Sequence, residues 1–240
     1  MAQPGEVVSP RERGELVAVG PPLDYSFKEL RTCAEIETEE PRSGVKRPGV
    51  DQKDGTGSGD FIATDQVAIA AAGAKAAMTR SRMVIRKVIA CIKLNNNCLQ
   101  SVNGLGRSLE LAMPSPVMNL QWLDISFNQI KTIEPEILTF VNLKALYLHG
   151  NLITRLAGVE RLRKLPKLLS LTLNGNPVES TGIYRCFIIG ALPTLKSLDH
   201  STITEDEFLG ASTWYQGHSR RAKKRREELD ELAAMKAAMD

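Results

Sequence analysis

The segment Leu143-Lys144-Ala145-Leu146-Tyr147-Leu148-His149-Gly150-Asn151-Leu152-Ile153 is one of four copies of a single pattern in this sequence of 240 residues. The pattern has aliphatic residues at its first, fourth, sixth and eleventh positions and asparagine at its ninth. The other copies run from Ile89 to Leu99, Leu120 to Ile130 and Leu168 to Val178, and a fifth, degenerate copy from Leu195 to His200 lacks the asparagine. Recurrence of this kind predicts a stack of similar structural units.

The spacing identifies the unit as a leucine-rich repeat, because successive pattern asparagines are 31, 23 and 25 residues apart and the usual period is ~20–29 residues. Side chains alternate along a strand, so the two aliphatic residues of Leu-x-Leu point inward and the residue between them points outward. The asparagine amide both donates and accepts, which suits the turn after each strand. We expect a structural asparagine ladder made by Asn97, Asn128, Asn151 and Asn176.

The predicted fold class is therefore α/β: a right-handed α-β horseshoe with a parallel sheet on its concave face, helical caps and disordered termini. We divide the chain into an N-terminal segment (1–44), a flexible linker (45–64), the repeat domain with its caps (65–204) and a charged C-terminal helix (205–240). Because a solenoid exposes apolar ends, both ends need covers. The helical spacing of Tyr184, Phe187, Ile188 and Leu192 predicts the C-terminal cover, and the alanine-rich residues 65–87 are the candidate for the N-terminal one.

Composition excludes several classes of protein. The net charge of +3 is too balanced for nucleic-acid binding along the whole chain, and no apolar run reaches the length of a membrane span. Pro4, Glu6 and Pro10 stand where a signal peptide is apolar, so we expect a cytoplasmic chain with reduced thiols. The four cysteines form no CxxC pair and the histidines are distant in sequence, so we expect no metal or cofactor.

Motifs inside and outside the repeats resemble the leucine-rich-repeat-containing protein fifty-one family from Pro21 to Ile203. The motifs outside the repeats are Pro21-Pro22-Leu23-Asp24-Tyr25-Ser26-Phe27, in which Leu23, Tyr25 and Phe27 alternate as in a short extended segment with one apolar face, and Glu39-Glu40-Pro41-Arg42-Ser43-Gly44. The repeat motifs alone are shared with phosphatase regulators, a spliceosomal subunit and a dynein light chain. Residues 45–81 and the tail after Gly217 depart from the family pattern.

The resemblance implies a non-enzymatic cytoplasmic protein from organisms that build motile cilia. It therefore favours a scaffold in a ciliary or axonemal assembly, with tubulin or axonemal proteins among the partners.

Outward positions of the strands predict a binding surface. Trp122 and Tyr147 fall on adjacent strands, and large aromatic side chains are enriched among residues that carry binding energy. An alternative remains open, in which the two rings cover each other or are covered by the N-terminal segment. The predicted partner-binding residues are Lys93, Asn95, Trp122, Asp124, Tyr147, His149, Thr172 and Asn174.

The C-terminal tail carries a dense run of cations that predicts polyanion binding. The run is followed by acidic residues and by a thin apolar stripe that includes Leu229 and Leu232. A nuclear import signal and a solvated helix without a partner remain open as alternatives. The predicted polyanion-binding residues are Arg220, Arg221, Lys223, Lys224, Arg225 and Arg226.

Three functions are compatible with these features. The leading hypothesis is a non-enzymatic scaffold that binds a protein through its concave face. The alternatives are an RNA- or nucleus-associated subunit that uses the basic tail, and a phosphatase-regulatory repeat protein. An enzyme is disfavoured, since the sequence offers His149 and Asp124 no activated nucleophile. A nucleic-acid partner is disfavoured because the tail has no aromatic residues for base stacking.

Overall fold

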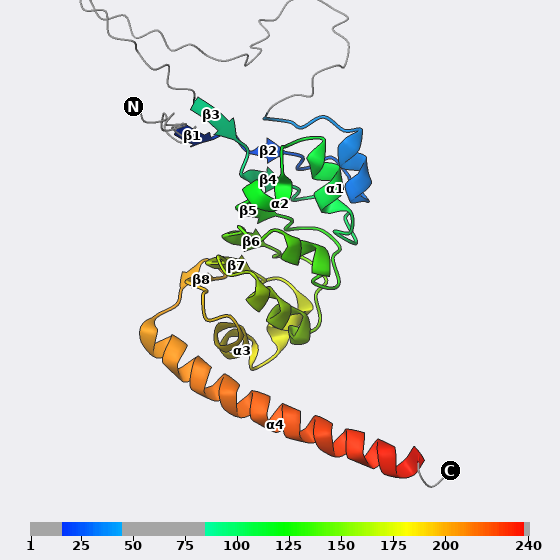
Figure 1. Ribbon diagram of the computed structural model, residues 1–240, viewed down its shortest axis with the longest axis vertical. Helices are drawn as coiled ribbons and strands as arrows, with labels where there is room; N and C mark the ends of the chain where they lie inside the picture. The colour runs from blue at the N-terminus through cyan, green and yellow to red at the C-terminus, as the bar shows by residue number, and fades with distance from the viewer. Residues whose placement is uncertain (1–15, 45–84, 238–240) are drawn as a thin grey trace, which may run out of the picture.

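The computed structural model describes residues 16–44 and 85–237, and it confirms the predicted leucine-rich repeat solenoid (Figure 1). Seven short strands stack in one sheet, parallel throughout except for the last pair. Their order is β2 (Leu23–Asp24), β4 (Cys91–Lys93), β5 (Trp122–Asp124), β6 (Ala145–Tyr147), β7 (Ser170–Thr172), β8 (Ser197–Leu198) and β9 (Ser201–Thr202). The predicted linker at 45–64 and the two ends of the chain, residues 1–15 and 238–240, lie outside the described residues.

Short helical segments connect the strands and cover the other face of the sheet (Figure 1). The inward leucines and isoleucines of every repeat lie between the two layers and form one continuous buried core. The segments are η1 (Cys33–Glu37), α1 (Leu105–Glu110), α2 (Pro116–Asn119), η2 (Pro135–Thr139), η3 (Leu156–Lys164), η4 (Pro177–Ser180) and α3 (Tyr184–Ala191).

The four pattern asparagines are buried and tie each repeat to the unit before it. Each Nδ2 donates to at least one carbonyl of its own repeat and to one of the preceding unit, and each Oδ1 accepts from backbone N–H of the preceding unit. For Asn151 these distances are 2.9 Å to Leu148 O, 3.0 Å to Ile125 O and 3.0 Å from Ile130 N. The asparagine side chains thus form hydrogen bonds with backbone N–H and C=O groups that have no backbone partner in the turns.

The N-terminal end of the sheet is covered by residues 23–44. Strand β2 pairs with β4, and Leu23, Tyr25 and Ile36 are buried against the first repeat. Phe27 departs from the predicted apolar face: its φ is 56°, so its ring leaves that face and is 63% exposed. The candidate helix at 65–87 lies mostly outside the described residues, and its described end belongs to strand β3 (Ile85–Val88), which pairs in parallel with β1 (Leu16–Val19).

The C-terminal end of the solenoid is covered by α3, whose Tyr184, Phe187 and Ile188 are buried. Helix α4 (Glu205–Ala237) then crosses this end and continues beyond it (Figure 1). Arg185 of α3 holds the start of α4 through two bonds to the Glu207 carboxylate. From Arg220 to Met235 every residue of α4 is exposed, so the second half of this helix stands free of the rest of the described chain.

Candidate protein-binding surface

Strand register places the predicted partner-binding residues in three rows on the concave face. Lys93, Asp124, Tyr147 and Thr172 form the central row across β4 to β7. Trp122 lies in the row before it, between Cys91 and Ala145. The third row follows the strands and contains Asn95, His149 and Asn174, which are half-buried.

Five rings gather on this face as an aromatic cluster, which we define as Trp122, Phe127, Tyr147, His149 and His200. The Trp122 and Tyr147 ring centroids are 5.5 Å apart with an interplanar angle of 75°, and those of Phe127 and His149 are 5.0 Å apart at 87°. His200 lies 5.9 Å from both Tyr147 and His149. Trp122 and Tyr147 do cover each other in part, and both keep some exposed surface. Edge-to-face contacts hold the rings in fixed positions.

Three buried polar atoms of this face make no hydrogen bond with the described residues: Asn95 Oδ1, Trp122 Nε1 and Asn174 Oδ1. In the described part of the chain, every other buried side-chain nitrogen or oxygen has a hydrogen-bond partner. An unpaired buried donor or acceptor costs about 1–3 kcal/mol. The concave face therefore holds one donor and two acceptors that have no partner among the described residues.

Thr172 does not face a partner as predicted, because it is fully buried. Its hydroxyl lies 2.8 Å from His149 Nδ1, so it orients the imidazole instead of forming the outer surface. Burial is the main cause that lowers the pKa of His149 below its ordinary value, and the nearby Asp124 carboxylate opposes this effect. Asp124 itself accepts hydrogen bonds from the Ser126 N–H and hydroxyl, at 3.0 and 2.6 Å.

Sequence reasoning missed Phe127 and His200. Phe127 precedes the ladder residue Asn128, and its φ of 51° turns the ring out, 53% exposed and packed on His149 and Gly150. His200 occupies the third leucine position of the degenerate fifth copy, which predicts an inward side chain. Asp199 and His200 both have positive φ, so the chain reverses into β9 and His200 is exposed.

Asp199 has a structural role at the end of the sheet. Its Oδ1 accepts from Leu173 N and Asn174 N at 2.7 and 3.0 Å, and its Oδ2 accepts from the Tyr184 hydroxyl at 2.8 Å. Burial and this bond raise the pKa of Tyr184. The repeat pattern gave no signal for this role, since Asp199 is at the fifth position of the degenerate copy and the missing asparagine belongs to the ninth, which is Ile203.

The predicted polyanion-binding residues lie on the free half of α4 and are all exposed. Three of them pair with acidic residues one turn later: Lys223 with Glu227, Lys224 with Glu228, and Arg226 with Asp230, at 3.7 to 3.9 Å. Such exposed pairs contribute little to stability, about 0.3–0.5 kcal/mol. The cations thus remain available to a ligand with higher charge density.

The described residues hold no group of three or more acidic, histidine or cysteine side chains that is suited to a metal ion. Burial raises the pKa of Cys33 to about 12 and that of Cys91 to about 11, so both thiols stay protonated at neutral pH. Neither therefore has the thiolate character of a nucleophile. Over residues 16–44 and 85–237, no helix is both long and apolar enough to span a bilayer.

This chain is similar to a family model and to several known proteins. Residues 107–229 match the model of the Leucine-rich repeat family. Leucine-rich repeat-containing protein 51 of Mus musculus is 37% identical over 194 residues, which cover 81% of this chain and 84% of that protein. The Homo sapiens protein of the same name is 34% identical over the same shares.

Two further similarities cover about half of this chain. A Caenorhabditis elegans protein named probable U2 small nuclear ribonucleoprotein A' is 35% identical over 101 residues, which cover 42% of this chain and 40% of that protein. The crystal structure of the Drosophila melanogaster SNF/U2A' complex contains a chain that is similar with a TM-score of 0.47 and 26% identity. That similarity covers 55% of this chain and 73% of the other.

Proposed function

Because the chain belongs to the leucine-rich repeat-containing protein 51 family, as its motifs predict, we propose that it is a non-enzymatic scaffold that binds a protein partner through its concave face. The observation that carries the proposal is the aromatic cluster beside the unpaired atoms of Asn95, Trp122 and Asn174. Clustered aromatic side chains are typical of binding hot spots. A rigid sheet that already holds them in place lowers the ordering cost of association.

We extend the proposal to the setting of the protein. The family resemblance supports a cytoplasmic location and a ciliary or axonemal assembly, in which tubulin or axonemal proteins are candidate partners. Tubulin fits the second part of the proposal, in which Arg220, Arg221, Lys223, Lys224, Arg225 and Arg226 bind a polyanion, because the tails of tubulin are acidic.

The concave-face proposal is tested with the double substitution Trp122→Ala/Tyr147→Ala. Purification of the full chain from ciliated cells, followed by mass spectrometry, identifies the partner, and binding is then measured with the purified pair. We expect the double variant to lose the partner while its circular dichroism spectrum and melting temperature stay close to those of the wild type.

The matched control is Leu111→Ala/Met118→Ala, which removes two exposed apolar side chains outside the concave face. The control should bind as the wild type does. If the cluster variant stays folded and still binds, the proposed surface is wrong. If it unfolds, the rings are structural.

A ribonucleoprotein subunit is the second candidate function. It is supported by the 35% identity over 101 residues to the C. elegans protein whose name places it in such a particle. That relative matches 42% of this chain, whereas the family relatives match 81%. We therefore favour the protein-binding scaffold, and RNA binding that persists at high salt would favour the alternative. The third alternative, phosphatase regulation, rests on the repeats alone.

A further inference from the structure

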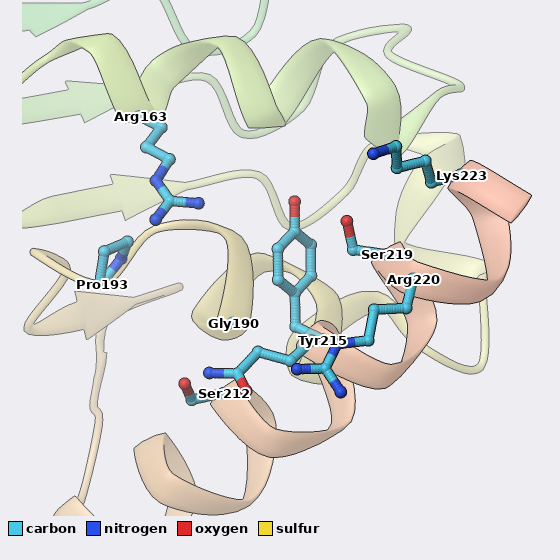
Figure 2. A pocket seen from close by; sticks show the side chains of 9 residues that line it. Arg163, Gly190, Pro193, Ser212, Tyr215, Ser219, Arg220 and Lys223 are labelled. Atoms are coloured by element: carbon cyan, nitrogen blue, oxygen red, sulfur yellow. The ribbon is translucent and has the colours of Figure 1, made fainter.

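A hollow of about 340 Å³ lies between η3, the end of α3 and the middle of α4 (Figure 2). It is separate from the concave face. Its lining includes three cations, Arg163, Arg220 and Lys223, and three neutral side chains that can donate hydrogen bonds, Ser212, Gln216 and Ser219. In Figure 2, Arg163 and Lys223 approach the Tyr215 ring from opposite sides, and Ser219 lies between Tyr215 and Lys223.

Positive charge in this hollow is poorly balanced. None of the residues that line it is acidic. Within the described chain, neither Arg163 nor Arg220 has a carboxylate within ion-pair distance, and Lys223 has only the 3.7 Å contact with Glu227. The nearby Glu160 carboxylate accepts a hydrogen bond from the Tyr215 hydroxyl at 2.9 Å. The cations are therefore free to bind an anion.

The fold holds the two sides of the hollow at a fixed separation. Gly190 lets α3 and α4 pack closely, because a Cβ there would lie 2.4 Å from Tyr215 Cβ and 2.6 Å from the Ala211 carbonyl oxygen. The Tyr215 ring packs edge-to-face on Phe187, with centroids 5.5 Å apart. Two basic segments that are distant in sequence, the last turn of η3 and the middle of α4, thus meet at one place.

We propose that this hollow binds the phosphate group of a phosphate monoester, carried by a phosphorylated side chain or by a small molecule. A monoester has close to two negative charges at neutral pH and three acceptor oxygens. Guanidinium, ammonium, hydroxyl and amide donors match both properties. The volume is at the lower end of the range for ligand pockets, which suits the phosphate and the atoms next to it.

Phosphate binding in the hollow does not depend on partner binding by the concave face. It shares Arg220 and Lys223 with the proposed polyanion-binding run, and the two proposals differ in one respect. A polyanion that follows the exposed helix is attracted by every cation of the run. A phosphate in the hollow contacts Lys223 but not Lys224, and it also contacts Arg163 of η3.

Neighbouring cations supply matched controls. Lys223 and Lys224 have side chains that are 80% and 79% exposed, and each pairs with a glutamate one turn later, yet only Lys223 lines the hollow. Arg161 and Arg163 are both exposed in the last turn of η3, and only Arg163 lines the hollow. Lys223→Gln is therefore compared with Lys224→Gln, and Arg163→Gln with Arg161→Gln.

The experiment is calorimetric titration of the full chain with phenyl phosphate, and with a phosphoserine peptide and its unphosphorylated form. We expect Arg163→Gln and Lys223→Gln each to weaken binding about five- to tenfold, which is about 1–1.4 kcal/mol. Arg161→Gln and Lys224→Gln should change it less than about twofold. Binding of phenyl phosphate alone assigns a small phosphate ester, and tighter binding of the phosphopeptide assigns a modified protein.

Three results would overturn the inference: no binding of either phosphate probe, equal binding of the unphosphorylated peptide, or equal losses in the two members of a matched pair. Equal losses would instead support a diffuse polyanion surface along α4. A single-stranded RNA that binds while phenyl phosphate and the phosphopeptide do not would assign the cations to nucleic acid. All substituted side chains are exposed, so melting temperatures should stay unchanged.

Discussion

The side-chain amide of Asn151 joins two repeats by pairing four backbone groups. It donates to carbonyls of Ile125, Leu148 and His149 and accepts from the N–H of Ile130. Because the side chain is buried, no solvent can replace these bonds. Each group left unpaired costs roughly 1–3 kcal/mol.

Asn151→Leu should therefore lower the unfolding free energy by several times the cost of one group, about 3–6 kcal/mol. Denaturant titration and thermal melts measure the loss. The control is Asn103→Leu at an exposed position, which should change the free energy by less than about 0.5 kcal/mol. An unchanged stability of the Asn151 variant would mean that the repeat register is wrong.

His149 lies between the binding surface and the core, and its titration reports on that position. Its lowered pKa means that the folded chain favours the neutral imidazole. The resulting stability is complete above the unfolded pKa of about 6.5 and is lost as the pH falls below it. Asp124 and Asp199 favour the charged form, and His200 disfavours it.

We expect NMR titration to give His149 a pKa below that of the same histidine in the urea-unfolded chain, and the folded protein to lose stability as the pH falls below about 6.5. A folded pKa at or above the unfolded value would contradict the buried, Thr172-bonded placement of the ring. If the cluster binds the partner, binding in turn should protect His149 further from protonation.

At the scale of the element, β2, the first strand of the seven-stranded sheet, shows what the sequence could predict and what it could not. Leu23-Asp24-Tyr25-Ser26-Phe27 matches Leu123-Asp124-Ile125-Ser126-Phe127 at four of its five positions. Both aspartates accept from the serine N–H two residues later, and both phenylalanines have positive φ. This match can be seen in the sequence, but Lys28 occupies the position at which each full repeat has its asparagine.

The first unit needs no asparagine at Lys28 because each asparagine of the ladder bonds to the unit before its own. A ladder asparagine pairs backbone groups of the unit before it, and the strand Leu23–Asp24 has no described unit of this sheet before it. Asn97 of the next repeat pairs the open groups of the first unit instead. Strand order and the inward leucines could be predicted from periodicity, whereas the positive φ of Phe127 and His200, which decides the aromatic cluster, depends on turns that periodicity does not describe.

A pair of charged side chains, Arg185 and Glu207, contributes to the docking of α4 onto α3. Bonds from Arg185 are the main cause that lowers the pKa of Glu207. The stability they add is complete above the unfolded pKa of a glutamate, about 4.3, and is lost as the pH falls through the folded value.

Glu207→Gln should remove this pH dependence and lower stability at neutral pH by about 0.2–1 kcal/mol, since both side chains are about one-third exposed. Hydrogen exchange of α4 amides near Glu207 should increase in the variant. A control, Glu228→Gln in the free half of the helix, should leave exchange near Glu207 unchanged. Equal exchange in wild type and Glu207→Gln would mean that the apolar contacts of Tyr215 suffice to hold the helix.

For the whole molecule, the solenoid and the second half of α4 form two functional parts. Contacts that fix α4 end with Tyr215 and His218, both packed on Phe187. Deletion of residues 220–240 should therefore leave the repeat domain folded, with a melting temperature close to that of the full chain. The same deletion removes the whole cationic run and part of the hollow, so it should weaken binding to polyanions.

A second truncation separates the cations from the acidic and apolar end of the tail. Deletion of residues 227–240 keeps Arg220 to Arg226 and removes the acidic residues and the apolar stripe with Leu229, Leu232 and Met235. We expect this variant to bind polyanions at least as well as the full chain, because three ion pairs that compete for the cations are gone. Loss of binding in both truncations alike would assign the interaction to the apolar stripe.

Microtubule co-sedimentation and an RNA gel shift, each at two salt concentrations, identify the polyanion. Binding through the exposed run should fall steeply with salt, because counterions released from the polyanion drive it. Salt-sensitive sedimentation with microtubules and no RNA shift would support the axonemal scaffold. RNA binding that persists at high salt would contradict it and favour the ribonucleoprotein function. If neither polymer binds, the polyanion proposal is wrong, and the concave face and the hollow beside Arg163 remain as the candidate sites.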